Sequence, residues 1–116
     1  MENTENILNL IDINTFAKVE LNIGVVVEAE KIEKSEKLLK LQVDLGELGK
    51  RQILSGIAKH YSPEEMLGKE VVVVTNLQPA KLMGIESQGM LLAAGDNTTL
   101  ALVCPEKKMG AGVKVR

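Results

Sequence analysis

The sequence predicts an all-β domain, a small barrel of five strands with one short helix and a β extension at the C-terminus. Apolar and polar residues alternate over several short segments. Glycine-containing turns separate these segments, and one strongly marked helix start lies between the third and fourth of them. The 116 residues, 45% of them hydrophobic, suit one domain. We expect residues 1–11 to form a leader or linker and residues 12–116 to form the domain.

The first predicted strand begins at Leu21 and alternates with period two as far as Glu30, which is typical of a half-buried strand. Gly24 within it predicts a bulge or a sharp bend, as barrel closure requires. One face carries Leu21, Ile23, Val25, Val27 and Ala29, and the other carries Asn22, Val26, Glu28 and Glu30.

Residues 31–37 form a charged hairpin loop, and residues 39–45 alternate again as a second strand. Gly46 and Gly49 bracket a turn before a short third strand at residues 51–55. Ser62 then predicts a helix N-cap, Pro63 a first helical position and Glu65 a capping box. With Gly68 as a stop signal, we expect a helix of one to two turns.

The β-branched run at residues 70–75 predicts a strand buried on both faces. A long connection at residues 76–88 leads to a fifth strand at residues 89–94, and residues 100–103 and 113–115 are predicted as short extra strands. Three strands, a helix and two more strands follow the order of an oligonucleotide-binding (OB) Greek-key barrel. A sandwich or an SH3-like barrel is the alternative, but the helix position and the bent first strand favour the OB arrangement.

The composition argues against an enzyme and against a secreted or membrane protein. One histidine, His60, and one cysteine, Cys104, leave no zinc cluster and no intramolecular disulfide. No phosphate-binding glycine loop and no catalytic triad spacing occur. No signal peptide is evident, and no apolar run approaches the roughly 20 residues that span a bilayer. We therefore expect a cytoplasmic, non-catalytic protein without a cofactor or metal.

Charge and aromatic content restrict any nucleic-acid partner. The formal net charge is -2, so attraction for a polyanion must come from a local patch. Phe16 and Tyr61 are the only aromatic residues, which is too few for base stacking along a single strand. The patch predicted here lies around the first hairpin and comprises Lys31, Lys34, Lys37 and Lys40. Interleaved glutamates leave open the alternative of an ordinary solvated hairpin.

Residues 76–90 are unusually long and apolar for an exposed connection. They include Leu77, Leu82, Met83 and Ile85, together with Lys81, Ser87 and Met90. Either the segment forms a surface for a partner or ligand, or it folds back on the core. Its length favours the first interpretation, because ordered long loops in small domains are usually functional.

Four segments carry a resemblance to a known family: KVELNIG at 18–24, KLLKLQVDLG at 37–46, SGI at 55–57 and NLQPAKLMGIESQGM at 76–90. They resemble the tRNA-binding domain at the C-terminus of many bacterial methionyl-tRNA synthetases, which also occurs as a free-standing protein or synthetase beta subunit. The resemblance covers residues 12–116. It implies an OB barrel that dimerises through its C-terminal extension and binds the outside corner of tRNA by shape.

The resemblance also implies a set of contacts. The family's Ser-x-Gly-Met element falls on Ser87, Gly89 and Met90, and a tRNA-contacting role is carried onto Ser87 and Met90. The family's basic contacts fall on Lys31, Lys37, Lys40 and Lys81. Asn22 stands where the family usually has arginine, so hydrogen bonding is retained there and a positive charge is lost.

These observations lead to one main hypothesis and two alternatives. The main hypothesis is a dimeric tRNA-binding module that assists methionyl-tRNA synthetase in cis or in trans. One alternative is a secretion-type chaperone that binds unfolded peptides through residues 77–90, and the other is a pure dimerisation domain. Steep salt dependence of binding distinguishes the first from the others.

Overall fold

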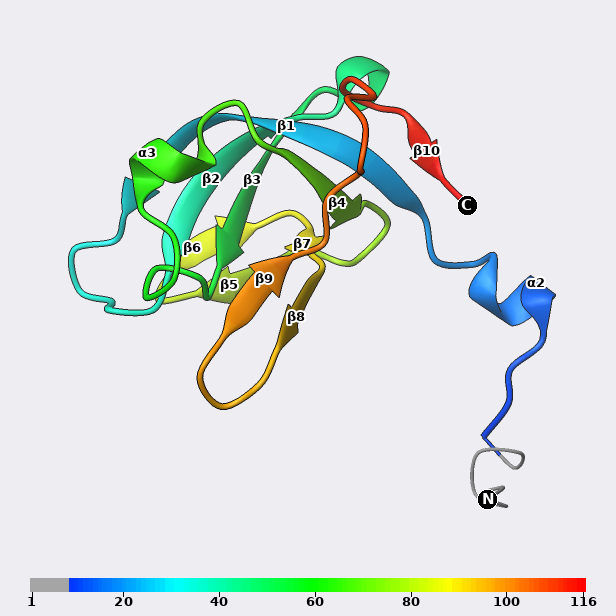
Figure 1. Ribbon diagram of the computed structural model, residues 1–116, viewed down its shortest axis with the longest axis horizontal. Helices are drawn as coiled ribbons and strands as arrows, with labels where there is room; N and C mark the ends of the chain where they lie inside the picture. The colour runs from blue at the N-terminus through cyan, green and yellow to red at the C-terminus, as the bar shows by residue number, and fades with distance from the viewer. Residues whose placement is uncertain (1–8) are drawn as a thin grey trace.

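The computed structural model describes residues 9–116 (Figure 1). The predicted leader therefore lies mostly outside the described residues. The strands of the main sheet are antiparallel and follow the order β3-β2-β1-β4-β7. Their bounds are β1 (Leu21–Lys31), β2 (Leu39–Asp44), β3 (Lys50–Ser55), β4 (Glu70–Val74) and β7 (Met90–Leu91). The predicted barrel with the OB strand order is confirmed.

The barrel is nearly closed by contact between β3 and the end of β6 (Ile85–Ser87). The backbone N–H of Gln88 donates to the carbonyl of Gln52 at 2.7 Å. One residue earlier, the Ser87 hydroxyl accepts from the N–H of Leu54 at 3.0 Å. β6 and β7 together thus fill the place of the fifth OB strand. The predicted single strand at residues 89–94 is wrong in extent, because β8 (Ala93–Gly95) leaves the barrel to pair with β9 (Leu100–Leu102).

Gly24 lies where β1 passes from one partner to another. Residues 21–25 pair with β4 and residues 25–31 pair with β2, so β1 belongs to both halves of the barrel. A Cβ at Gly24 would lie 2.4 Å from Cγ1 of Val43 and 3.1 Å from Cγ2 of Val73. The glycine is therefore required for close packing of strands across the interior.

The predicted bulge in β1 occurs at a different place, between Val26 and Glu28. An extra residue in one strand reverses the alternation beyond it. Val26, before the bulge, is 1% exposed and part of the core, and Ala29, beyond it, also packs against the core, whereas Val27 between them is 39% exposed. The prediction that Ala29 shares a face with Ile23 and Val27, opposite Val26, did not allow for this reversal.

The helix α3 (Pro63–Met66) begins as predicted. Ser62 accepts from the Glu65 N–H at 3.1 Å, and the Glu65 carboxylate accepts from the Ser62 N–H at 2.8 Å. Met66 is fully buried and joins the core cluster. The buried β-branched run of β4 is also confirmed, since Val71 to Val74 are all at most 5% exposed.

Residues 76–88 hold the clearest departure from the predicted connection. They contain a β-hairpin of β5 (Ala80–Leu82) and β6, joined by a two-residue turn at Met83 and Gly84. Both turn residues have positive φ, 53° and 79°. This is the backbone sign that two-residue hairpin turns require. The sequence does not predict this turn, because methionine is not a usual residue at a turn position with positive φ.

The helix that precedes β1 and the C-terminal strand both lie beside the start of β1 (Figure 1). The short helix α2 (Ile13–Phe16) is capped by Asp12, whose carboxylate accepts from the Thr15 N–H at 2.7 Å. It stands away from the barrel on an arm. At the C-terminus, β10 (Lys114–Val115) pairs with the start of β1, and the η1 turn (Gly46–Leu48) lies between β2 and β3. Within residues 9–116, no helix is long and apolar enough to cross a bilayer.

Candidate nucleic-acid interface

One end of the barrel carries most of the predicted lysines. Lys31, the last residue of β1, pairs with Leu39, and Leu39 pairs with Ser55. The loop at residues 32–38 and the segment that follows β3 therefore leave the barrel at the same end. They are in contact there, because the Ala58 N–H donates to the Lys37 carbonyl at 2.9 Å. We call this the basic end.

The hairpin of β5 and β6 extends toward the basic end. Gln88 bonds Gln52 and Ser87 bonds Leu54, so the chain running back from Gln88 passes along β3 in the direction of Ser55. The hairpin turn therefore lies beyond the same end of β3 as the loop 32–38. Lys81, paired with Glu86 across the hairpin, is brought to this region.

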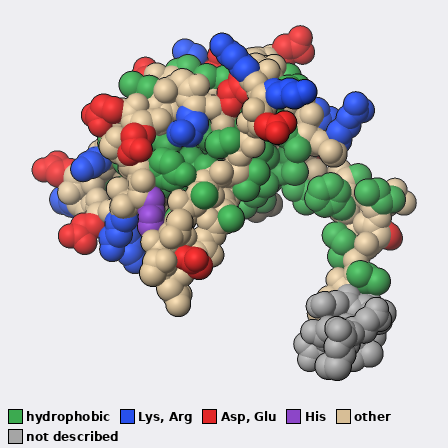
Figure 2. Space-filling view, in the orientation of Figure 1, with side chains coloured by type: hydrophobic (Ala, Val, Ile, Leu, Met, Phe, Trp, Pro, Cys, Tyr) green, Lys and Arg blue, Asp and Glu red, His purple; other side chains and the backbone are tan. Residues whose placement is uncertain are grey.

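The side chains at the basic end are available for an external partner. Lys31, Lys34, Lys37 and Lys81 are exposed, and so is Lys59, which sequence reasoning missed. Among the described residues the only ion pair within 4.0 Å joins Lys40 to Glu30 at 2.8 Å. Lys40 is thus partly neutralised, while the other lysines are not paired with any described carboxylate. Exposed blue side chains beside the single histidine are visible in Figure 2.

The local structure of the loop 32–38 gives Lys37 a defined position. The Ser35 hydroxyl accepts from the N–H groups of Lys37 and Leu38, at 3.2 and 3.1 Å. This serine turn fixes the backbone just before β2. Glu33 and Glu36 lie in the same loop and are exposed, so the field of the lysines is local rather than uniform.

A second group of predicted residues lies at the other end of the barrel. Asn22 accepts from the Thr75 hydroxyl at 2.8 Å and donates to the Gly112 carbonyl at 3.2 Å. Its amide is thereby already engaged within the protein. Met90 pairs with Val74, which pairs with Leu21, so Met90 lies at the same end of the barrel as Asn22, two strands away, and is 46% exposed. The structure does not bring this pair together with the lysines.

Arg51 belongs to this second group and was missed by sequence reasoning. Its guanidinium donates to the Thr75 carbonyl at 2.5 Å and lies 3.5 Å from the Gln88 carbonyl. It therefore supplies a positive charge next to Asn22, where the resemblance leads one to expect arginine. Arg51 faces inward because it pairs with the buried Val43 across β2 and β3.

Ser87 lies in the seam between the two groups and is 5% exposed. Its hydroxyl accepts from Leu54 and donates to the Gly89 carbonyl at 3.2 Å. Both of its hydrogen-bonding functions are used within the barrel. Its predicted contact with tRNA stays a prediction, and the structure adds a role in closing the barrel.

At the middle of the outer surface of β2 and β3, two side-chain amides form hydrogen bonds. The Gln42 side chain donates to the Gln52 side chain at 3.1 Å, and Gln52 donates in turn to the Glu86 carbonyl at 2.8 Å. These bonds couple the hairpin to the sheet. They also leave a polar surface without aromatic rings on which bases could stack.

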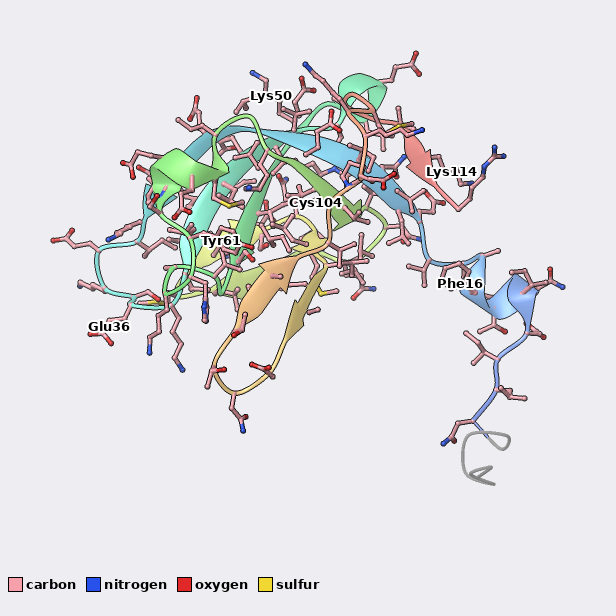
Figure 3. All side chains as sticks on the ribbon, viewed as in Figure 1. Phe16, Glu36, Lys50, Tyr61, Cys104 and Lys114 are labelled. Carbon is pink, nitrogen blue, oxygen red and sulfur yellow. The ribbon has the colours of Figure 1, made fainter. Side chains whose placement is uncertain are left out.

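The described residues contain no group of three or more residues suited to hold a metal ion. His60 and Cys104 are exposed and belong to no such group. Tyr61 is also committed within the fold, because its hydroxyl accepts from the Leu102 N–H at 3.1 Å and Lys69 lies over its ring at 5.7 Å. Figure 3 places Phe16 on the N-terminal arm, apart from the barrel that carries Tyr61.

Apolar side chains gather in the hollow between the barrel and the N-terminal arm (Figure 2). On the arm Leu10, Ile11 and Ile13 are at least 65% exposed and Phe16 is 43% exposed. On the barrel an apolar groove is lined by residues of β1, β4 and the C-terminal extension: Ile23, Val72, Val103, Pro105, Met109 and Val113. We call these two surfaces together the apolar hollow.

Comparison with protein families finds one matching model, described as "Putative tRNA binding domain", over residues 21–114. Among curated proteins, the methionine–tRNA ligase of Methanococcus aeolicus is 55% identical over 105 residues, covering 90% of this chain and 15% of that ligase. The corresponding ligase of Thermotoga maritima is 58% identical over 107 residues, covering 92% and 17%. The chain thus spans less than a fifth of these ligases.

Two solved structures share the fold over nearly their whole length. The protein from Pyrococcus horikoshii described as related to methionyl-tRNA synthetase has a TM-score of 0.86 and 39% identity, covering 93% of this chain and 99% of that one. The chaperone CsaA of Bacillus anthracis has a TM-score of 0.84 and 29% identity, covering 92% and 99%. The described strands and the capped helix are therefore those of a fold shared by both.

Proposed function

The chain belongs to the family of tRNA-binding domains, and we propose that it is a non-catalytic module that binds tRNA and assists methionyl-tRNA synthetase in cis or in trans. The chain matches only the fraction of the ligases that carries this domain, 15% and 17% of the two compared. Aminoacylation is a property of those longer proteins. A weak RNA site linked to a catalytic body raises the local tRNA concentration without new active-site contacts.

The observation that carries the proposal is the cluster of exposed lysines at the basic end. Lys31, Lys34, Lys37, Lys59 and Lys81 lack ion pairs with described carboxylates, so their charge is free to neutralise phosphates. Each phosphate neutralised releases counterions and strengthens the dependence of binding on salt. Because the formal net charge is only -2, binding depends on local contacts between these lysines and the RNA backbone rather than on the overall charge of the chain.

Shape recognition fits the side chains better than sequence recognition. Tyr61 is engaged by Leu102 and Lys69, and Phe16 lies on the arm, so the barrel offers no stacking platform for a series of bases. Folded RNA is bound largely through its backbone and overall form. We assign the basic end to phosphate contacts, with Asn22, Met90 and Arg51 as a second contact region and Ser87 as the residue that joins them.

We further propose that the domain comprises residues 12–116, acts in the cytoplasm and forms a homodimer through the apolar hollow. Phe16 and the neighbouring apolar residues of the arm do not belong to the core cluster, and the groove on the barrel is lined by residues of β1, β4 and the C-terminal extension. An exposed apolar surface of this extent is typical of an interface. A dimer would place two basic ends on one particle and increase the number of phosphates contacted.

A chaperone that binds unfolded peptides is the second candidate. The likeness to CsaA and the exposed apolar residues Leu77, Leu82 and Met83 favour it. Peptide binding through such residues depends weakly on salt, whereas tRNA binding weakens steeply as salt rises. The pure dimerisation domain predicts neither activity.

The test compares Lys37→Gln with Lys50→Gln, both substitutions of an exposed lysine. Lys37 lies at the basic end, while Lys50 begins β3 and pairs with Asp44, away from it. The affinity for bulk tRNA is measured at several salt concentrations. We expect Lys37→Gln to reduce the slope of log K against log salt by about one phosphate contact, roughly 0.9, and Lys50→Gln to leave it unchanged. Equal slopes for both variants would remove the basic end from the interface.

A further inference from the structure

Met83 adopts a backbone conformation that its side chain does not favour. Its φ of 53° and the 79° of Gly84 form the turn between Leu82 and Ile85, which face each other across the hairpin. Asparagine or aspartate before glycine is the usual choice for such a turn, because these residues tolerate positive φ. In the residues described, Met83 is the only non-glycine residue with positive φ. The methionine therefore requires an explanation other than turn formation.

Packing within the domain does not provide that explanation. Met83 is 54% exposed and the preceding Leu82 is 40% exposed, and neither belongs to the core cluster. The hairpin thus presents a flexible, polarisable thioether to the surroundings. A strained residue that lies outside the core is a candidate for a functional contact.

The base of the hairpin is firmly attached to the barrel. Gln52 donates to the Glu86 carbonyl at 2.8 Å, and Ser87 and Gln88 bond the backbone of β3. The tip therefore has a defined direction with respect to β3. Because it extends toward the basic end, Met83 lies on the same side of the barrel as the lysines that we assign to phosphates.

We propose that Met83 is an apolar wedge that packs against an exposed nucleobase face of folded RNA while the lysines hold the backbone. This inference rests on the proposed function. Methionine and other apolar side chains are known to insert against base steps in nucleic acids. A folded tRNA exposes base faces where its helical arms meet, whereas the interior of a long duplex keeps its bases stacked. The wedge would thus add selectivity for folded RNA to a basic surface that has none by itself.

The decisive variant is Met83→Asn, which turns the hairpin tip into a favoured Asn-Gly turn. We expect its melting temperature to be equal to or above that of the unaltered protein, because asparagine tolerates the positive φ. We expect its affinity for tRNA to fall roughly five- to tenfold, at the lower end of what a base contact contributes. The dependence on salt should not change, since no phosphate contact is lost.

Two further variants and one further RNA separate the wedge from other effects. Met83→Leu keeps an apolar side chain and should keep most of the affinity, while Lys81→Gln should lower the salt slope. On a long, fully paired RNA duplex, Met83→Asn should bind as well as the unaltered protein. Together these results would support a wedge specific for folded RNA.

Each contrary result is distinct. Unchanged tRNA affinity in Met83→Asn, or a loss of equal size on duplex and tRNA, overturns the wedge and leaves the proposed function intact. A protein that binds no tRNA at all overturns both. If the unaltered protein binds an unfolded polypeptide and Met83→Asn loses only that binding, the tip serves peptides and the RNA wedge is wrong.

Discussion

The Ser87 hydroxyl accepts a hydrogen bond from the backbone N–H of Leu54 at 3.0 Å, and both residues are buried. The bond crosses from β6 to β3, where the backbone ladder of the barrel is incomplete. A side chain therefore takes the place of a carbonyl in satisfying a buried donor. Through this bond the hairpin that carries Lys81 and Met83 is joined to the strand that leads to the basic end.

Ser87→Ala is expected to destabilise the domain by about 1–3 kcal/mol, because it leaves the Leu54 N–H buried without an acceptor. The free energy of unfolding in denaturant measures the effect. Ser55→Ala is the matched control, since Ser55 lies on β3, is half-buried and has no side-chain bond to a described residue. Equal stability of the two variants would show that the contact between β6 and β3 does not depend on the Ser87 hydroxyl.

Gly24→Ala is expected to cost about 1–3 kcal/mol, as overpacking of a filled interior does. The added methyl group would lie 2.4 Å from Val43 and 3.1 Å from Leu45, both fully buried. Gly56→Ala provides the control, because nothing lies within 4 Å of a Cβ there. Thermal unfolding compares the variants, and a Gly24→Ala protein as stable as Gly56→Ala would contradict the packing account.

Glu70 attaches the C-terminal extension to the barrel. Its carboxylate accepts from the N–H groups of Met109 and Gly110, at 2.8 and 2.7 Å, and these bonds lower the pKa of Glu70. Because the pKa is lowered in the folded state, the ionised carboxylate stabilises the attachment at pH values above the ordinary pKa range of glutamate. This stabilisation is lost as the pH falls through the lowered pKa.

The Met109 and Gly110 amide resonances should therefore shift in acid with an apparent pKa below that of an ordinary glutamate. Glu70→Gln should abolish this titration, while Glu64→Gln, in the first turn of α3, should leave it unchanged. An apparent pKa at or above the ordinary value would contradict the attachment.

Phe16→Asp tests the proposed dimer without disturbing the barrel. Phe16 is 43% exposed on the arm and is not among the core residues. A carboxylate there should be strongly disfavoured in an apolar interface, so we expect monomers by light scattering at micromolar concentration. Leu67→Asp, 54% exposed beside α3, should stay dimeric. Dimers in both variants would exclude the arm from the interface.

The fold was largely predictable because its signals are local. The capping box at Ser62 and the buried run of β4 require only short sequence patterns, and both are found as predicted. The reversal that brings Ala29 to the core side of β1 was not predictable, since a bulge depends on the register of a strand with its neighbour. The hairpin turn at Met83 was missed for a related reason: tertiary contacts of β6 with β3 override a poor turn residue.

The candidate site was predictable only in part. The charged pattern around residues 31–37 predicts exposed lysines. It does not show that Lys40 pairs with Glu30, or that the other lysines of the basic end form no ion pair with a described residue, because both depend on the three-dimensional structure. Arg51 was missed because its position beside Asn22 results from long-range pairing. No sequence pattern shows that Asn22 and Met90 lie at the opposite end of the barrel from the basic end. Their place follows from the strand register.

The central claim is that this domain binds folded tRNA through a basic end. The most direct measurement is a titration of the unaltered protein with bulk tRNA and with a single-stranded RNA of similar length, each at two salt concentrations. The account predicts tighter binding to tRNA than to the single strand, with affinity falling steeply as salt rises. Equal binding to both RNAs, or no binding to either at low salt, would contradict it.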